Sequence, residues 1–240
     1  MGTTHIVTAF DAELDGISTR IAEMGALAEE QLGQALDAIR LRDVALADQV
    51  IAADSKLDQL EMKLEEMTIQ TLALRQPMAG DLRQVVAALK IASTLERIGD
   101  LAKSIARRTK YITEQHPAKI SSSILRMGQQ CRVLVSEVLD AYDTRDTALA
   151  VSVWSRDVEI DEMHNSIFRE LVSYMIEDPH MIGLCSQLLF VAKNLERIGD
   201  HATFIGEMTY FVVEGKPLRD NRPKGEPLGE LPKPDADLKM

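Results

Sequence analysis

The sequence predicts an all-α protein made of two tandem antiparallel three-helix bundles related by internal duplication. Only 4% of the 240 residues are aromatic, and the chain is rich in Ala, Leu, Glu and Met, which favour helices over strands. The hexapeptide Leu-Glu-Arg-Ile-Gly-Asp occurs twice, at 95–100 and at 195–200. Six identical residues at that separation are hardly expected by chance, so the chain contains two copies of one unit. Pro77, Pro117 and Pro179 separate long stretches of helical periodicity and therefore indicate helix boundaries.

Three helices are expected in the first unit, at about 7–39, 44–74 and 81–112. In each stretch the apolar residues recur at steps of three and four, as they do on the buried face of an amphipathic helix. A short break near Arg42 separates the first helix from the second, and Pro77 ends the second helix.

The same pattern then restarts in the second unit after a joint at about 113–117. Its helices are expected at about 120–142, 147–176 and 181–213, and Pro179 separates the last two. Each unit is therefore predicted to be a narrow bundle of three long helices.

These patterns divide the chain into a first bundle at 1–114, a second bundle at 118–214 and a tail at 215–240. Five of the eight prolines lie in the last 24 residues, together with glycines and many charges. Because such a composition buries little apolar surface, we expect the tail to be disordered.

The charge and hydropathy of the chain exclude several classes of protein. A net charge of −11 makes the chain a poor ligand for nucleic acids, whose phosphates need clustered Lys and Arg. We find neither an apolar run long enough to span a membrane nor a signal peptide. Cys131 and Cys185 are expected to be buried thiols in a reducing environment. The sequence therefore predicts a soluble cytoplasmic protein.

Each unit carries two pairs of carboxylates spaced four residues apart on neighbouring helices. The pairs are Asp54/Asp58 and Glu96/Asp100 in the first unit, and Asp157/Asp161 and Glu196/Asp200 in the second. Residues four apart lie on the same helix face, so each pair repels itself, and antiparallel packing could bring the two pairs of a unit together. Such a group needs bound cations, partner arginines or protonation. Oxygen ligands without thiolates suit Mg²⁺, Mn²⁺ or Fe, so we predict metal binding, with a solvated acidic face as the alternative.

Other residues near the repeated hexapeptide are weaker candidates. Arg97 and Arg197 could pair with carboxylates of a neighbouring helix or bind an anion such as phosphate. Gly99 and Gly199 lie within predicted helices, where glycine is unfavourable, so we expect a close helix contact at each. His164 follows Asp161 by three residues and could be a ligand, although a surface histidine is the simpler interpretation. The sequence contains no combination of residues that demands catalysis.

Three features of the sequence occur together: the doubled hexapeptide, Arg75-Gln76-Pro77 followed by Asp81-Leu82-Arg83, and the segment Phe10-Asp11-Ala12-Glu13-Leu14. In these features the sequence resembles the PhoU family of bacterial regulators of phosphate uptake. The resemblance covers about residues 5–213 and excludes the tail.

The resemblance implies a fold and a set of functional expectations. The fold is the PhoU-like pair of three-helix bundles, with metal ions (Fe, Mn, Mg, Zn or Ni) at the eight carboxylates of the acidic pairs. The implied role is negative regulation of phosphate uptake and of the phosphate-starvation (Pho regulon) response. The implied partners are a sensor histidine kinase of the PhoR type and the ATPase of the phosphate ABC transporter (PstB type), so that contact with the membrane is only indirect. A cytoplasmic homodimer is also implied.

Two other hypotheses remain open at this point. The first is a carboxylate-ligated helical metalloenzyme, although the chain has no E-x-x-H motif within a helix to support it. The second is a metal-free structural adaptor whose acidic pairs meet arginines of a partner protein.

Overall fold

A computed structural model describes residues 2–114 and 122–218, and all regular secondary structure in these residues is helical. The predicted all-α fold with two three-helix repeats is confirmed. The joint at 113–117 and the tail at 215–240 lie partly outside the described residues. The first repeat comprises α1 (Gly2–Leu41), α2 (Val44–Arg75) and α3 (Ala79–Glu114). The second comprises α4 (Ser122–Thr144), α5 (Thr147–Ser155), α6 (Asp157–Glu177), the short 3₁₀-helix η1 (Pro179–Met181) and α7 (Ile182–Glu214).

The first turn of each repeat is built in the same way. Arg42 ends α1 and Arg145 ends α4, each in the left-handed region, with φ of 57° and 55°. The next residue in each repeat, Asp43 or Asp146, caps the following helix by accepting hydrogen bonds from its first backbone N–H groups. The two repeats therefore share the conformation of this turn as well as the hexapeptide.

The second helix of the second repeat differs from the prediction of one helix at 147–176. The helix is interrupted at Arg156, whose φ of −86° and ψ of 1° lie outside the α-helical region. The backbone makes one turn there between the end of α5 and the start of α6. The Arg156 guanidinium reaches across to α4, where it forms an ion pair with Glu137. Helical periodicity continues on both sides of the break, which is why the apolar pattern did not reveal it.

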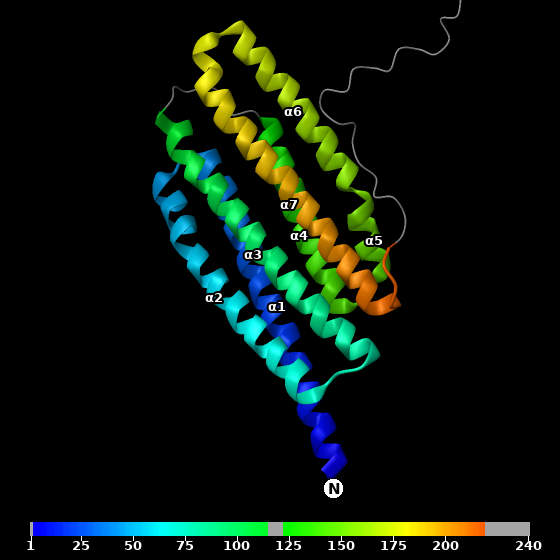
Figure 1. Cartoon of the computed structure of the whole chain (residues 1–240). Coiled ribbons are helices and arrows are strands. Elements are labelled where there is room, and N and C mark those ends of the chain that lie inside the picture. Colours follow the sequence, from blue (N-terminus) through cyan, green and yellow to red (C-terminus); the bar gives the residue numbers. More distant parts are fainter. Residues whose placement is uncertain (1, 115–121, 219–240) are drawn as a thin grey trace, which may run out of the picture.

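The two repeats lie side by side, with their third helices in contact and antiparallel (Figure 1). Arg108 of α3 donates to Gln187 of α7 at 2.7 Å, and its guanidinium lies 4.3 Å from the Phe190 ring. One turn earlier in α3, the Ser104 hydroxyl accepts from the Asn194 amide at 3.0 Å. In this arrangement α2 and α6 lie on opposite outer sides of the molecule (Figure 1).

A reciprocal pair of contacts joins α1 to α4. A Cβ added to Gly25 would overlap the Leu139 side chain, and a Cβ added to Gly128 would overlap that of Leu36. Gly128 lies 103 residues after Gly25, and Leu139 lies 103 residues after Leu36. The duplication therefore generates the two contacts together. Buried side chains from both repeats form one hydrophobic cluster across this interface. The glycines therefore allow the close approach on which the shared core depends.

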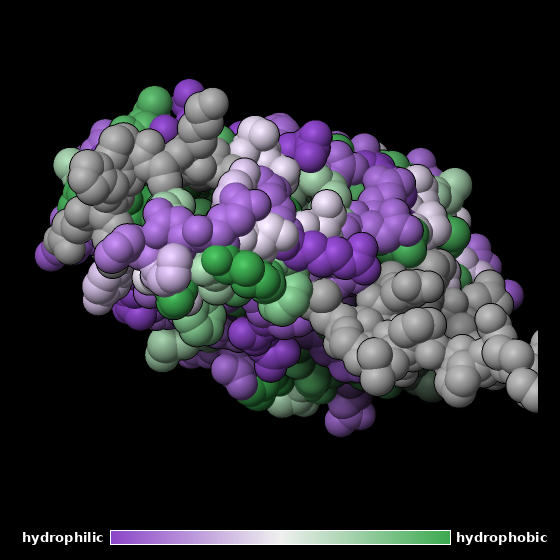
Figure 2. Space-filling view, turned by 90° about the horizontal axis from the view of Figure 1, so that it is seen from above, coloured by the Kyte–Doolittle hydropathy of each residue, from purple (hydrophilic) through white to green (hydrophobic). Residues whose placement is uncertain are grey.

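One end of the molecule is largely polar. Seen from the end that carries the α6–α7 hairpin, the surface is mainly hydrophilic and has only small hydrophobic patches (Figure 2). Among the described helices, none has a stretch both long and apolar enough to cross a lipid bilayer.

We predict that Gln31→Leu stabilises the protein. Gln31 of α1 is 1% exposed, and both polar atoms of its amide lack a hydrogen-bond partner within the described structure. The equivalent position in the second repeat, 103 residues later, is the fully buried Leu134. Since a buried polar group without a partner costs about 1–3 kcal/mol, thermal unfolding should show a Tm raised by about 2–4 °C per kcal/mol recovered.

Leu134→Gln is the matched control, and it should lower the Tm because it creates the same defect in the second repeat. A lower Tm for Gln31→Leu would instead show that the amide is satisfied by an internal water molecule.

Candidate functional site

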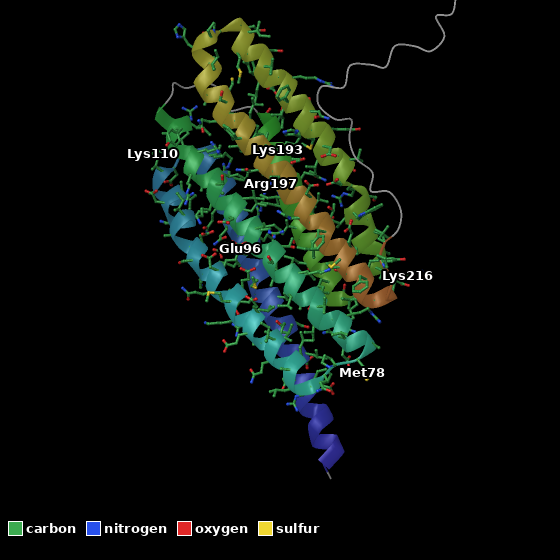
Figure 3. The ribbon with its side chains drawn as sticks, viewed as in Figure 1. Met78, Glu96, Lys110, Lys193, Arg197 and Lys216 are labelled. Carbon is green, nitrogen blue, oxygen red and sulfur yellow. The ribbon has the colours of Figure 1, made fainter. Side chains whose placement is uncertain are left out.

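The antiparallel packing of α2 against α3 brings the acidic pairs of the first repeat to one face. Asp54 and Asp58 lie on α2, and Glu96 and Asp100 lie on α3. Asp54 is only 5% exposed, at the edge of the core, whereas the Asp100 side chain is 54% exposed. Glu96 extends from α3 on the side that faces α2 (Figure 3). The expected approach of the two pairs is therefore present in the first repeat.

A lysine provides the counter-charge for two of these carboxylates. The Lys103 ammonium donates hydrogen bonds to Asp54 and, at 3.2 Å, to Asp100 Oδ1. The hydrogen bond to Asp54 is the main cause of a raised Lys103 pKa. This single ammonium thus holds α2 and α3 together at the point where a bound cation had been expected.

Glu96 lies among carboxylates, and within the described residues no Lys or Arg forms an ion pair with it. Burial, followed by the negative charge of Asp100, raises the pKa of Glu96 to about 7 from an ordinary value of 4.5. Smaller contributions come from Glu61, from a hydrogen bond with Asp100 and from Asp58. Near neutral pH the Glu96 carboxyl is therefore partly protonated, and this partial neutralisation relieves part of the repulsion among the carboxylates.

The second repeat carries the equivalent carboxylates but neutralises them differently. Lys193, one turn before Glu196 on α7, forms an ion pair with it at 2.6 Å. His164 of α6 lies near Glu196 and Asp161, and burial lowers its pKa despite these negative neighbours. Asp157 is 1% exposed and corresponds to Asp54 of the first repeat.

Three substitutions between the repeats account for this difference. Thr203 occupies the position of Lys103, Lys193 occupies the position of Ser93, and His164 occupies the position of Glu61. Thr203 donates its hydroxyl to the Asp200 carbonyl, so it does not take over the lysine's role. The duplicated acidic faces have therefore diverged in charge.

The arrangement bears directly on the prediction that the eight carboxylates bind metal. Among the residues that the structure describes, no group of three or more His, Cys, Asp or Glu side chains is placed to hold a metal ion. In the first repeat the Lys103 ammonium takes the position between Asp54 and Asp100, and in the second Lys193 engages Glu196. Metal binding at the eight carboxylates therefore stays a prediction, and in the first repeat a metal ion would have to displace the Lys103 ammonium from Asp54 and Asp100.

The other candidates near the hexapeptide have simpler roles. Arg97 and Arg197 are both exposed, and within the described structure neither forms an ion pair with a carboxylate. A Cβ on Gly99 would overlap Leu57, and a Cβ on Gly199 would come within 3.2 Å of Ile160 Cγ2. The close contact expected at each glycine is thus confirmed, and it joins the third helix to the second helix in both repeats.

The two lysines were not among the residues predicted from the sequence to belong to the site. Lys103 follows Asp100 by three residues and Lys193 precedes Glu196 by three, so both spacings place the ammonium on the carboxylate's own face. That local signal was present in the sequence. The contact of Lys103 with Asp54, 49 residues away, needed the tertiary structure.

Comparison with known proteins gives a consistent result for both repeats. A model of the PhoU domain matches residues 21–109 and again residues 124–209. A phosphate-specific transport system accessory protein PhoU homolog from Caulobacter vibrioides is 48% identical over 229 residues, covering 95% of this chain and all of the relative. A protein of the same name from Rhizobium meliloti is 43% identical over 232 residues, covering 96% of this chain and 98% of the relative.

Two crystal structures share the fold. PhoU from Pseudomonas aeruginosa superposes with a TM-score of 0.84 at 38% identity, covering 86% of this chain and all of that structure. The phosphate transport system regulatory protein PhoU from Streptococcus pneumoniae gives a TM-score of 0.81 at 26% identity, with coverage of 87% and 99%.

We predict that Lys103→Met destabilises the protein. The substitution leaves the carboxylate of Asp54 buried without its ammonium, which should reduce the free energy of unfolding by about 2 kcal/mol, as measured by urea denaturation. Adding Asp54→Asn to Lys103→Met should recover most of this loss, because the buried charge is then removed. Equal losses in the single and double variants would show that Lys103 acts through its aliphatic packing instead.

We predict that Glu96→Gln raises the Tm at pH 8 but has little effect near pH 5. A carboxyl whose pKa is raised in the folded state destabilises the fold as pH rises from about 4.5 to about 7, because the unfolded chain releases its proton first. Gln cannot ionise, so it avoids this loss. Since solvent screens part of the repulsion, we expect a rise of about 2 °C at pH 8.

Glu196→Gln is the matched control. It removes a carboxylate that is already paired with Lys193, so its Tm should not rise at pH 8. A pH-independent effect of Glu96→Gln would contradict the charge crowding described above.

Proposed function

Because this chain belongs to the PhoU family of phosphate transport accessory and regulatory proteins, we propose that it restrains phosphate uptake and the phosphate-starvation response when phosphate is plentiful. The observation that carries the proposal is the 48% identity with the Caulobacter vibrioides accessory protein, which extends over both repeats and all of that protein's length. The proposed action is negative regulation by contact between proteins in the cytoplasm.

The proposed partners are a sensor histidine kinase of the PhoR type and the PstB-type ATPase of the phosphate ABC transporter. The names of the relatives place them with the phosphate-specific transport system, which supports a transporter component as one partner. The fold supports docking, because α2 and α6 each present a long outer face (Figure 1). A homodimer would display both repeats twice and is part of the same proposal.

The accessory and regulatory roles of the relatives do not support the alternative of a carboxylate-ligated metalloenzyme. A metal-free adaptor is compatible with the Lys103 and Lys193 contacts, which stabilise the acidic faces without a metal ion. Metal binding at the eight carboxylates remains a separate proposal with its own test.

Deletion of the gene tests the regulatory role. We expect phosphate-scavenging genes to be expressed in high phosphate, as measured by a transcriptional reporter, because the restraint on the starvation response is lost. Supplying the wild-type chain in trans should restore repression. Normal repression in the deletion strain at high phosphate would refute the proposed function.

Metal analysis of the purified protein tests the second proposal. Because Thr203 replaces Lys103, we expect bound Fe, Mn, Mg, Zn or Ni to be lost mainly in Asp157→Asn with Asp200→Asn. The matched variant of the first repeat, Asp54→Asn with Asp100→Asn, should retain most of the metal because Lys103 competes there. Equal and negligible metal in the wild type and both variants would favour the metal-free adaptor.

A further inference from the structure

The outer face of α2 carries a stripe of residues at alternating steps of three and four. The stripe consists of Gln59, Met62, Glu66, Ile69 and Ala73, which line one shallow, open groove. The Met62 side chain is 69% exposed and that of Ile69 is 55% exposed. Large apolar side chains with this exposure lie on the solvent side of α2, because the core uses the opposite side of the helix.

The spacing of the stripe fits a helix better than other occupants. Steps of three and four along 59–73 are those by which one α-helix meets another lying alongside it. A groove lined by a single helix is too open to enclose a small molecule, whereas an amphipathic helix can lay its apolar face along Met62, Ile69 and Ala73.

The two edges of the stripe differ in charge. Asp58, Glu61 and Glu65 follow one another at steps of three and four along one edge, whereas Lys56 and Lys63 lie along the other. The acidic edge continues onto α3, since Asp58 and Glu61 both lie near enough to raise the pKa of Glu96. Apart from Glu66 within the stripe, the carboxylates lie along one edge, so basic residues of an incoming helix would meet them mainly there, which sets its orientation.

The second repeat does not reproduce this surface. On α6, Asn165 stands at the position of Met62, Val172 at that of Ile69, and His164 at that of Glu61. Lys193 also neutralises Glu196 beside this helix. Of the two outer helices, α2 and α6, the described residues of α2 therefore combine the apolar stripe with the acidic edge, and those of α6 do not.

We propose that the outer face of α2 binds an amphipathic helix of a partner protein, with an apolar stripe on Met62 and Ile69 and Lys or Arg along the edge that meets Asp58, Glu61 and Glu65. The inference rests on the docking role proposed above and specifies the surface and the chemistry of the partner. Peptide binding is measured on the purified chain, so its failure is distinguishable from failure of the phosphate phenotype.

The probe is a fluorescein-labelled synthetic 18-residue helix with Leu at heptad a and d positions and Lys along one edge, studied by fluorescence anisotropy in 150 mM salt. We expect saturable binding to the full chain with a Kd of about 10–100 µM. A scrambled peptide of the same composition is the control for attraction to the net negative charge, and it should bind at least 10-fold more weakly. Equal binding of the two peptides would overturn the proposal.

Variants locate the site. Met62→Gln with Ile69→Gln should weaken binding about 10-fold or more, without loss of stability because both side chains are exposed. The matched variant on α6, Asn165→Gln with Val172→Gln, should bind as the wild type does. Glu61→Gln with Glu65→Gln should weaken binding and reduce its dependence on salt. Unchanged binding by the Met62 and Ile69 variant, or equal loss in the α6 variant, would overturn the proposal.

Sedimentation of the chain alone tests the other occupant of this face, a second copy. We expect Met62→Gln with Ile69→Gln to leave the oligomeric state unchanged. A shift from dimer to monomer in that variant would show that α2 pairs with its own copy, and it would overturn the assignment to a partner's helix.

Discussion

The close approach of α1, α3, α4 and α7 is the constraint on which the rest of the molecule depends. These four helices bury the facing sides of both repeats in one hydrophobic cluster, and Gly25 and Gly128 leave the room for Leu139 and Leu36 in that contact. Because the centre is filled in this way, α2 and α6 cover the outside of the molecule, each with one face toward the core and one toward solvent. The outer helices therefore carry the surfaces on which the proposed docking would take place.

The same packing determines the electrostatics of the acidic pairs. They lie where an outer helix meets a central one, so that Asp54 and Asp157 are buried while Asp100 remains largely exposed. A buried carboxylate needs a partner in a medium of low polarity, and Lys103 supplies it for Asp54. Among the described residues Glu96 has no such partner, and it holds a proton up to about pH 7 instead. The acidic face of the first repeat thus combines a buried carboxylate, Asp54, that is paired with a lysine and a second carboxylate, Glu96, whose charge is relieved by a proton.

The duplication gives two copies of this face, which differ in charge and in the apolar residues beside them. Lys193 and His164 reduce the negative character of the second face, while Met62 and Ile69 add an apolar stripe next to the first. A regulator that contacts more than one protein needs surfaces that differ, because specificity depends on the difference between affinities. The divergence between the repeats provides such a difference on a common backbone.

The sequence by itself determined the fold class, the duplication, most helix boundaries and the family, because apolar periodicity, prolines and the repeated hexapeptide are all local signals. It also identified Gly99 and Gly199 as points of close helix contact, which their contacts with Leu57 and Ile160 bear out. Only the tertiary structure decided the break at Arg156, the shared core and the partner of Asp54. Each of these depends on residues far apart in the chain: Glu137 pairs with Arg156, Leu139 covers Gly25, and Lys103 reaches Asp54 from the next helix. The four-residue spacing of the carboxylates indicated repulsion that had to be relieved, but whether a metal ion, a proton or a lysine relieved it depended on which side chains the packing brought beside them.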